Sequence, residues 1–366
     1  MRRMDQFIQD NLEKVPAPRK GGLWGLSDVI GTAGANAIAQ AGRICFHATG
    51  DTGLPKDNMQ EPVAEAMAAD LKPDDSAGSV AFFLHLGDVI YFNNTDPGYL
   101  EQFYQPYKPY PGKIIAIAGN HDGEVKGGNQ SATLVAFLKN FCPPQPTVHS
   151  AAGTIFREMV AQPGVYWHLN CPFLDLIGLY TNVADGPGYL SEAPGGPAQI
   201  KWFRKRLAAI AKARSAAGQR RALILCLHHP PYSSGGHSGN PQEVTALQSA
   251  FDAAKIIPDV VLSGHSHNYQ RHTRRLNFGG ENWEIPYFIA GFGGHNLSGF
   301  QVATGQHSGD TTFDKSFSGY GYLLLDVNPQ QIVIKVNQVK GRPGNPQVSP
   351  FETVTVNLTN HSVSTS

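Results

Sequence analysis

Residues that could bind metal ions gather in five short segments of the chain. These segments are Gly50-Asp51-Thr52-Gly53, Gly87-Asp88-Val89-Ile90-Tyr91, Gly119-Asn120-His121-Asp122, His228-His229-Pro230 and Gly264-His265-Ser266-His267. Aspartate can bridge two cations, imidazole suits transition metals, and an asparagine carbonyl fills a ligand position without adding charge. Two cations about 3.5–4 Å apart can together polarise a phosphoryl oxygen and lower the pKa of bound water. The segments therefore indicate a dinuclear metal site, and Asp88 is its natural bridging ligand.

Each of these segments follows a short apolar run. The five runs cover residues 43–49, 79–86, 113–118, 222–227 and 259–263. Short β-branched runs of this kind predict buried strands, so the polar residues stand at the carboxyl ends of the strands. In α/β folds, sites are built at that edge of the sheet. Helical patterns at 61–70, 199–213 and 241–254 lie between or beside these strands and predict βαβ units with parallel pairing.

Further strands follow in the second half of the chain. Residues 166–169 and 173–180 predict a hairpin. Residues 287–290, 320–327, 331–336 and 353–356 alternate apolar and polar positions, which predicts antiparallel strands of a second sheet.

Three regions are expected along the chain. Residues 1–40 form an N-terminal extension, with one helix near its start and a weak helix over 27–41, which packs on the main domain. Residues 41–340 form the catalytic domain, and residues 341–366 form a C-terminal strand and tail. An insertion at about 123–164 directly follows a ligand segment, so it either caps a pocket or decorates the surface.

Composition narrows the class of protein. Lys and Arg number 29 and Asp and Glu number 29, with a pI of about 7.2, so the chain lacks the basic footprint of a dedicated nucleic-acid binder. No apolar stretch is long enough to span a membrane, and no apolar signal region follows the N-terminal arginines. We expect a cytoplasmic protein as the sequence is written, or a secreted or periplasmic one if this is a processed form. The oligomeric state stays open.

Several other polar residues allow more than one interpretation. We expect free thiols at the four cysteines. His47 and His85 either pack in the core or support the ligands from behind, without a direct role. His295 follows a further strand end, and it either lines the pocket around the metal site or lies outside that pocket. The remaining basic groups are Arg271, Arg274 and Arg275, which either reach a substrate or form a solvated cluster, and the solvated helix face of Lys201, Arg204, Lys205 and Arg206.

The five segments together resemble the motifs of the calcineurin-like metallophosphoesterase superfamily. Details resemble its purple acid phosphatase branch: Asp51-Thr52-Gly53, Tyr91 three residues after Asp88, and the pattern Gly-His-x-His-x-Tyr-x-Arg from Gly264 to Arg271. The resemblance covers roughly residues 43–336, and no separate amino-terminal β-domain is evident. It implies an α/β protein with a four-layer α/β/β/α sandwich of two mixed sheets flanked by helices.

The resemblance also implies a role for each residue. One metal would be held by Asp51, Asp88, Tyr91 and His267, and the other by Asp88, Asn120, His228 and His265. The branch has Fe(3+) at the tyrosine site and Fe(2+), Zn(2+) or Mn(2+) at the other. His121 and His237 correspond to histidines that contact phosphate and protonate the leaving group. Two alternatives stay open: Tyr91 merely packs beside the site, or His237 is only a loop residue.

The expected function is hydrolysis of a small phosphate monoester by a hydroxide activated at the dinuclear centre. One alternative is a phosphodiesterase acting on cyclic nucleotides or phospholipid head groups. The other is a catalytically silent scaffold that keeps the fold.

Overall fold

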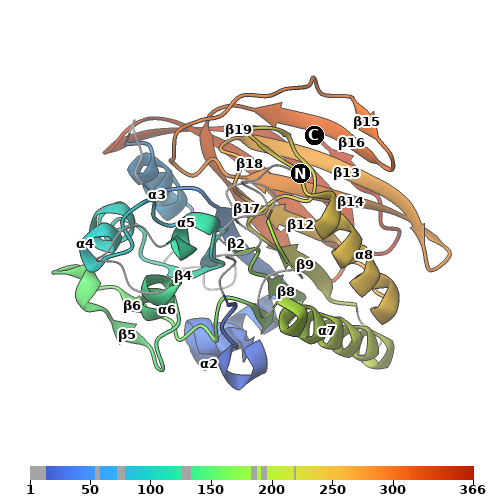
Figure 1. The fold of residues 1–366 in the computed structure, drawn as a ribbon, viewed down its shortest axis with the longest axis horizontal. Helices are drawn as coiled ribbons and strands as arrows, with labels where there is room; N and C mark the ends of the chain where they lie inside the picture. Colours follow the sequence, from blue (N-terminus) through green and yellow to red (C-terminus); the bar gives the residue numbers. More distant parts are fainter. Residues whose placement is uncertain are drawn as a thin grey trace.

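Two large β-sheets face each other, with helices on their outer sides (Figure 1). This computed structural model describes residues 14–53, 58–71, 79–124, 133–182, 188–190, 196–217 and 220–366. The larger sheet has the order β1 (Leu23–Gly25), β7 (Trp167–Asn170), β8 (Leu174–Gly178), β9 (Ala222–Cys226), β12 (Val260–Ser263), β14 (Glu281–Ala290), β13 (Tyr269–Phe278), β16 (Thr311–Phe317) and β15 (His307–Ser308).

The second sheet holds the first three ligand-bearing strands. Its order is β20 (Val363–Thr365), β19 (Asn345–Asn357), β18 (Gln331–Arg342), β17 (Tyr320–Val327), β2 (Ile44–Thr49), β3 (Val80–His85) and β4 (Lys113–Ala116). Two small hairpins join β5 (Thr147–Val148) to β6 (Glu158–Met159) and β10 (Ser234–Gly235) to β11 (His237–Ser238). The pairs β2–β3, β3–β4, β9–β12 and β12–β14 are parallel.

The helices lie mainly outside the sheets. They are α2 (Leu26–Ala41), α3 (Gln60–Ala69), α4 (Asp96–Tyr99), α5 (Asn120–Gly123), α6 (Val135–Phe141), α7 (Gly196–Ala217) and α8 (Pro241–Ala254). Single turns occur at η1 (Arg19–Gly22) and η3 (Ser150–Ala152), and η2 (Leu100–Tyr104) is a π-helical turn. None of the helices in the described ranges is both long and apolar enough to cross a bilayer.

Three apolar cores hold the layers together. Phe46 and Leu325 from one sheet share the central core with Ile224 from the other. Phe203 of α7 packs in a second core with Leu225 of β9, and a third core lies beneath α3 and η2. Burial of these side chains is the main favourable term in folding. The arrangement confirms the predicted four-layer α/β/β/α sandwich.

The predicted assignment of strands to sheets was wrong. Strand β17 pairs antiparallel with β2, so β17, β18 and β19 extend the sheet of the first three ligand segments. Strand β14 instead pairs parallel with β12 in the other sheet. Alternation of apolar and polar residues along a strand indicates that one face of the strand is buried and the other is more exposed. It does not specify which strand lies next to it. The five ligand segments therefore come from two sheets rather than from one.

Other local predictions are confirmed. The hairpin of β7 and β8 is antiparallel, and α3, α7 and α8 cover the three predicted helices. All four cysteines are free. The boundaries predicted at residues 40 and 340 stay predictions; β1 pairs with β7, and β18 runs across residue 340. The helix predicted near the N-terminus and residues 125–132 of the insertion fall outside the described ranges.

Arg271 and Arg274 fit neither interpretation offered for them. Arg271 is 7% exposed and forms ion pairs with Glu352 and Asp314, at 3.1 and 3.0 Å. Arg274 is also buried, and its Nε lies 2.7 Å from Asp310 Oδ2. Only Arg275 is substantially exposed. The first two arginines fasten β13 to its surroundings, because buried cations require a partner.

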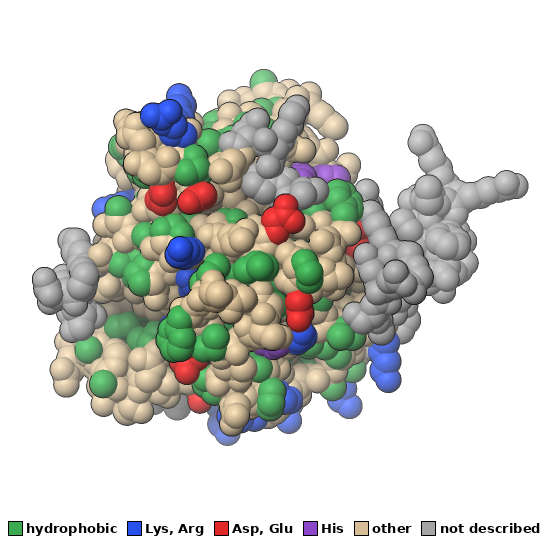
Figure 2. Space-filling view, turned by 90° about the vertical axis from the view of Figure 1, so that its left-hand side faces the viewer, with side chains coloured by type: hydrophobic (Ala, Val, Ile, Leu, Met, Phe, Trp, Pro, Cys, Tyr) green, Lys and Arg blue, Asp and Glu red, His purple; other side chains and the backbone are tan. Residues whose placement is uncertain are grey.

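Charge is mixed over the surface shown in Figure 2. Acidic and basic side chains stand among hydrophobic and uncharged ones on this face, and neither sign dominates the described residues drawn there. This distribution agrees with the equal numbers of acidic and basic residues in the sequence.

His272 in β13 should make stability sensitive to acid. It is 4% exposed and stacks on Phe313, and burial lowers its pKa to about 4 from 6.5, with the charge of Arg271 acting in the same direction. Between these pH values the unfolded chain binds a proton at this residue and the folded chain does not, so stability falls as pH falls. The contribution is at most about 3 kcal/mol.

We therefore expect His272→Phe to lose less stability than the parent protein between pH 7 and pH 4. Urea unfolding at both pH values measures the difference. His307→Phe, at an exposed histidine, is the control and should follow the parent. Equal pH slopes for the parent and His272→Phe would contradict this role.

Candidate metal centre

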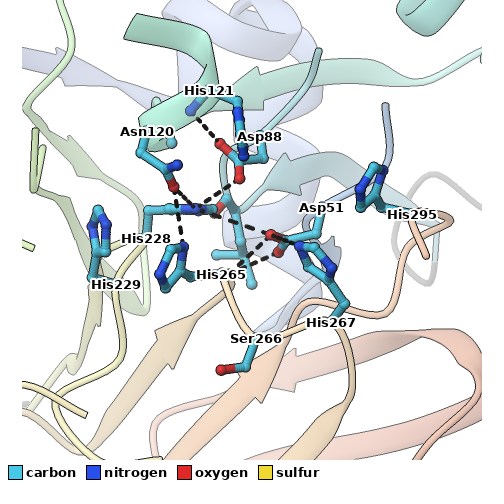
Figure 3. Close-up of polar contacts among 12 residues, drawn as sticks. Asp51, Asp88, Asn120, His121, His228, His229, His265, Ser266, His267 and His295 are labelled. Carbon is cyan, nitrogen blue, oxygen red and sulfur yellow. Dashed lines mark hydrogen bonds and ion pairs between the residues drawn. The ribbon is translucent and has the colours of Figure 1, made fainter. Parts of the chain in front are cut away.

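The five ligand segments meet at one end of the facing sheets (Figure 3). Backbone hydrogen bonds tie the segments together. The amide of Asp51 donates to Gly87 O at 2.9 Å, and the amide of Gly264 donates to His228 O at 3.0 Å. The amide of Gly50 donates to Ala290 O at 2.9 Å and so connects the two sheets. The strands thus hold the side chains in place before any ligand binds.

One group of ligand atoms surrounds the amide oxygen of Asn120. His228 Nε2 lies 3.1 Å from this oxygen, and His265 Nδ1 lies 3.0 Å from it. Asp88 Oδ2 is 3.1 Å from His228 Nε2. Asp88, His228 and His265 form a buried group whose ligand atoms all lie within 4.8 Å of one another. These four side chains are the set predicted for one metal.

A second group of ligand atoms forms a triangle beside the first. The Tyr91 hydroxyl lies 3.4 Å from Asp51 Oδ1 and 3.2 Å from His267 Nε2, and His267 Nε2 lies 3.6 Å from Asp51 Oδ1. Asp51 Oδ1 is 4.0 Å from His228 Nε2, so the two groups adjoin. The structure thus brings all seven predicted ligands together, and their binding of metal stays a prediction.

The backbone is unusual at several of these positions. Asp51, Asp88 and His265 have φ values of 57°, 52° and 67°, in the left-handed region. Residues with side chains seldom adopt this region, and such conformations cluster at functional sites. Each of these residues directly follows a glycine at the end of a strand. Figure 3 shows the side chains of Asp51, Asp88 and His265 gathered in one cluster.

The buried acidic groups and imidazoles of the cluster shift one another's pKa values. Burial raises the pKa of Asp51 to about 8, although His228 opposes the change. The pKa of Asp88 lies below its usual range, because His228 and His121 outweigh the effect of burial. Burial and the neighbouring histidines lower the pKa of His265 well below its ordinary value. Against the effect of burial, Asp88 and Asp51 raise the pKa of His228 to about 10. Two buried carboxyl groups and three imidazoles form a donor set that suits cations, so the residues fit a metal centre.

Both predicted non-ligand histidines lie beside the cluster. The His121 ring centroid is 4.4 Å from that of Tyr91, and the His121 amide donates to Asp88 Oδ1 at 2.9 Å. The His237 ring centroid is 4.1 Å from that of His265. His121 Nδ1 also lies 3.0 Å from Glu124 Oε2, so this carboxylate orients its imidazole.

The hairpin that carries His237 is held by two side chains, Ser266 of the fifth ligand segment and Gln270 of β13. Ser266 Oγ accepts a hydrogen bond from the His237 amide at 3.1 Å and donates one to His237 O at 3.2 Å. Gln270 Nε2 donates to Gly235 O at 3.0 Å, and Gln270 Oε1 accepts from the Ser234 amide at 2.7 Å. Ser266 points away from the ligand cluster in Figure 3. Ser266, which stands between the predicted ligands His265 and His267, therefore positions His237.

Sequence reasoning missed Asp122, Glu124, Ser266 and Gln270. Asp122 accepts hydrogen bonds from the amides of Gly119 and Val89, at 2.8 and 3.1 Å, and so ties the third segment to the second. Its place three residues after Gly119 was a visible capping signal. Glu124 acts through a local contact with His121, three residues earlier. Ser266 and Gln270 act through tertiary contacts that no spacing in the sequence reveals.

Four further histidines lie outside the two ligand groups. His295 stacks on Tyr91, with ring centroids 3.7 Å apart, so it belongs to the wall of the centre. His229 lies behind His265, and its Nδ1 is 2.6 Å from Thr181 Oγ1. His47 and His85 are buried, which fits both interpretations offered for them.

Comparison with known proteins gives consistent results. The family model described as calcineurin-like phosphoesterase matches residues 46–269. Purple acid phosphatase 15 of Arabidopsis thaliana is 24% identical over 208 residues, which are 54% of this chain and 34% of that protein. The chain thus spans about a third of the length of that relative.

Two solved structures share the fold. One is the purple acid phosphatase PPD1 from yellow lupin seeds, with 17% identity and a TM-score of 0.58 over 87% of this chain and 54% of that chain. The other is GAP50, the anchor in the inner membrane complex of Plasmodium, with 16% identity and a TM-score of 0.54 over 84% of this chain and 89% of that chain. At these identities the likeness establishes the fold.

Proposed function

The chain belongs to the calcineurin-like phosphoesterase family, and we propose that it hydrolyses phosphate monoesters at a dinuclear metal centre. The observation that carries this proposal is the pair of adjoining ligand groups with Asp88 at their junction. One group contains Asp88, Asn120, His228 and His265, and the other contains Asp51, Tyr91 and His267 beside Asp88.

The chain's own residues would divide the work. Two bound cations would lower the pKa of water and polarise the phosphoryl oxygen of the ester. The buried carboxylates of Asp51 and Asp88 would hold the cations, and backbone hydrogen bonds would keep the ligands in position. His121 and His237 would contact the phosphate, and one of them would deliver a proton to the leaving oxygen.

Tyr91 makes the proposal testable by colour. Burial and the nearby Asp88 and Asp51 raise the pKa of the Tyr91 hydroxyl well above its ordinary value, so only a strongly acidic metal ion would ionise it. We propose Fe(3+) at the Tyr91 position and Fe(2+), Zn(2+) or Mn(2+) at the other.

The experiment is aerobic reconstitution with iron, followed by metal analysis, an absorption spectrum and turnover of p-nitrophenyl phosphate. We expect two metals per chain, turnover, and a broad visible band that Tyr91→Phe removes. Tyr189→Phe, at another buried tyrosine, is the control and should keep the band. A band that survives in Tyr91→Phe would show that this tyrosine is only a neighbour.

The same preparation separates the two alternatives. Faster turnover of bis(p-nitrophenyl) phosphate than of the monoester would replace the proposal by a phosphodiesterase. Absence of both metal and turnover would indicate a scaffold.

His237→Ala should keep both metals and lose rate. The His237 ring stands beside His265 but outside both ligand groups, so metal content should not change. If His237 protonates the leaving group, the loss should reach about a hundredfold with phenyl phosphate. It should be smaller with p-nitrophenyl phosphate, whose leaving group needs less help.

His307→Ala, at an exposed histidine, is the matched control and should be silent. An equal loss on both substrates would exclude proton delivery by His237 and leave it a role in binding.

A further inference from the structure

A cavity of about 490 Å³ lies at the far end of the larger sheet from the metal centre. Its walls come from β1, β7 and α7, and Arg221 contributes from the residue just before β9. His228 of the metal centre follows the other end of β9, and a strand of five residues spans roughly 17 Å. The cavity is therefore separate from the metal centre, and a ligand bound there would not depend on phosphoesterase activity.

The Asp175 carboxylate, beside this cavity, already has hydrogen-bond partners at both of its oxygens. Asp175 Oδ1 lies 2.8 Å from His168 Nε2 and accepts hydrogen bonds from Asn170 Nδ2 at 3.1 Å and Arg221 Nη2 at 3.0 Å. Asp175 Oδ2 accepts from Arg221 Nε at 3.0 Å. Since a carboxylate only accepts, Nε2 of His168 is the donor in this contact, and the tautomer with its proton on Nε2 has Nδ1 as a hydrogen-bond acceptor.

Among the described residues, three buried nitrogen atoms of cavity-lining residues have no hydrogen-bond partner: Nε1 of Trp24, Nδ1 of His168 and Nε of Arg206 on α7. His168 is only 5% exposed, whereas Trp24 pairs with Leu169 in the register, so its side chain lies on the opposite face of the sheet from that of His168. His168 pairs with Leu23 in the sheet register, so both side chains lie on the same face of the sheet. Unpartnered buried polar atoms are costly, and they indicate that a ligand or water completes the site.

Positive charge exceeds negative charge around the cavity. Helix α7 contains no acidic residue and six basic ones, namely Lys201, Arg204, Lys205, Arg206, Lys212 and Arg214. Close to the cavity, Arg214 and Arg220 share Asp259, and Arg221 is paired with Asp175. Among the described residues, Arg206 has no acidic partner within ion-pair distance, so it can serve an anionic ligand.

We propose that this cavity binds an organic phosphate in its singly protonated form. The phosphate oxygens accept hydrogen bonds from Arg206 and Arg221, and the P–OH group donates to His168 Nδ1. The apolar walls at Leu23 and Ile210 take the organic part, because the cavity is far larger than a phosphate ion needs. A carboxylate ligand lacks the O–H donor and would leave His168 Nδ1 without a partner.

The test is calorimetric titration of the metal-loaded, full-length protein with phenylphosphonate, which resists hydrolysis. We expect two binding events, one at the metal centre and one at the cavity. Arg206→Gln should raise the Kd of the cavity event at least about tenfold and leave the metal-centre event unchanged.

Lys205→Gln is the matched control, because it removes one positive charge from an exposed position of the same helix. It should bind phenylphosphonate as the parent does, and benzoate should bind the cavity more weakly than phenylphosphonate. Three outcomes would each overturn the proposal: a single event at the metal centre, unchanged binding by Arg206→Gln, or equal losses in Arg206→Gln and Lys205→Gln. Failure of the metal-centre event alone would count against the proposed function and not against this site.

Discussion

Asp88→Asn should bind neither metal ion and should lose turnover by at least about a thousandfold, or roughly 4 kcal/mol of transition-state stabilisation. Asp88 is fully buried, its Oδ2 lies 3.1 Å from His228 Nε2, and its Oδ1 accepts the amide of His121 at 2.9 Å. Loss of its charge removes the ligand at the junction of the two groups. Metal analysis after reconstitution and turnover of p-nitrophenyl phosphate give the result directly.

Two further variants make this test specific. Asp51→Asn should weaken mainly the metal at the Tyr91 position, because Asp51 stands in the triangle with Tyr91 and His267. Asp252→Asn makes the same change at an exposed aspartate and should be silent. An Asp88→Asn protein that kept two metals and normal turnover would disprove the bridging assignment.

The ligand set was predictable because chemistry and local structure coincide in the sequence. Four of the seven predicted ligands directly follow a glycine that ends an apolar run, and these are Asp51, Asp88, Asn120 and His265. The length and composition of an apolar run suffice to predict where a strand ends. The type of the polar residue that follows then suggests a metal ligand. Gly87 has a φ of 93°, a conformation that glycine adopts more easily than other residues. The glycine in the sequence therefore indicates this turn.

Pairing across the molecule was not predictable in the same way. The sequence of β17 shows one buried and one more exposed face, but nothing in it specifies β2 as its neighbour. Long-range partners depend on how both sheets pack, and Arg271 illustrates the same limit. Its partner Glu352 is 81 residues away in the chain. The sequence therefore shows only a group of basic residues, whereas the fold buries Arg271 in an ion pair.

The supporting contacts of the site were the hardest part to foresee. Ser266 lies inside a ligand segment, yet its hydroxyl contacts the backbone of His237 instead of the metal positions. Serine is common on surfaces and in turns, so its type carries little information. Such residues emerge only when tertiary geometry shows which backbone atoms they hold.

Gly119→Ala should disrupt the centre almost as severely as loss of a ligand. Gly119 has φ −90° and ψ −175°, which any residue can adopt, so backbone strain is not the reason. A Cβ atom at this position would stand 2.1 Å from Asp88 Oδ1 and 2.4 Å from the Asp88 amide nitrogen. Asp88 cannot easily move away from the added Cβ atom, because it is held by contacts with His121 and His228.

The expected result is fewer than two metals per chain, a lower melting temperature, and turnover reduced by about a hundredfold or more, since a displacement near 1 Å at a catalytic centre has effects of this size. Gly299→Ala is the matched control, because a Cβ there meets no atom within 4 Å. Circular dichroism should show that both variants keep the fold. Normal metal content in Gly119→Ala would mean that the second and third segments can separate without loss of the site. The close contact between Gly119 and Asp88 would then not be what holds the ligands in place.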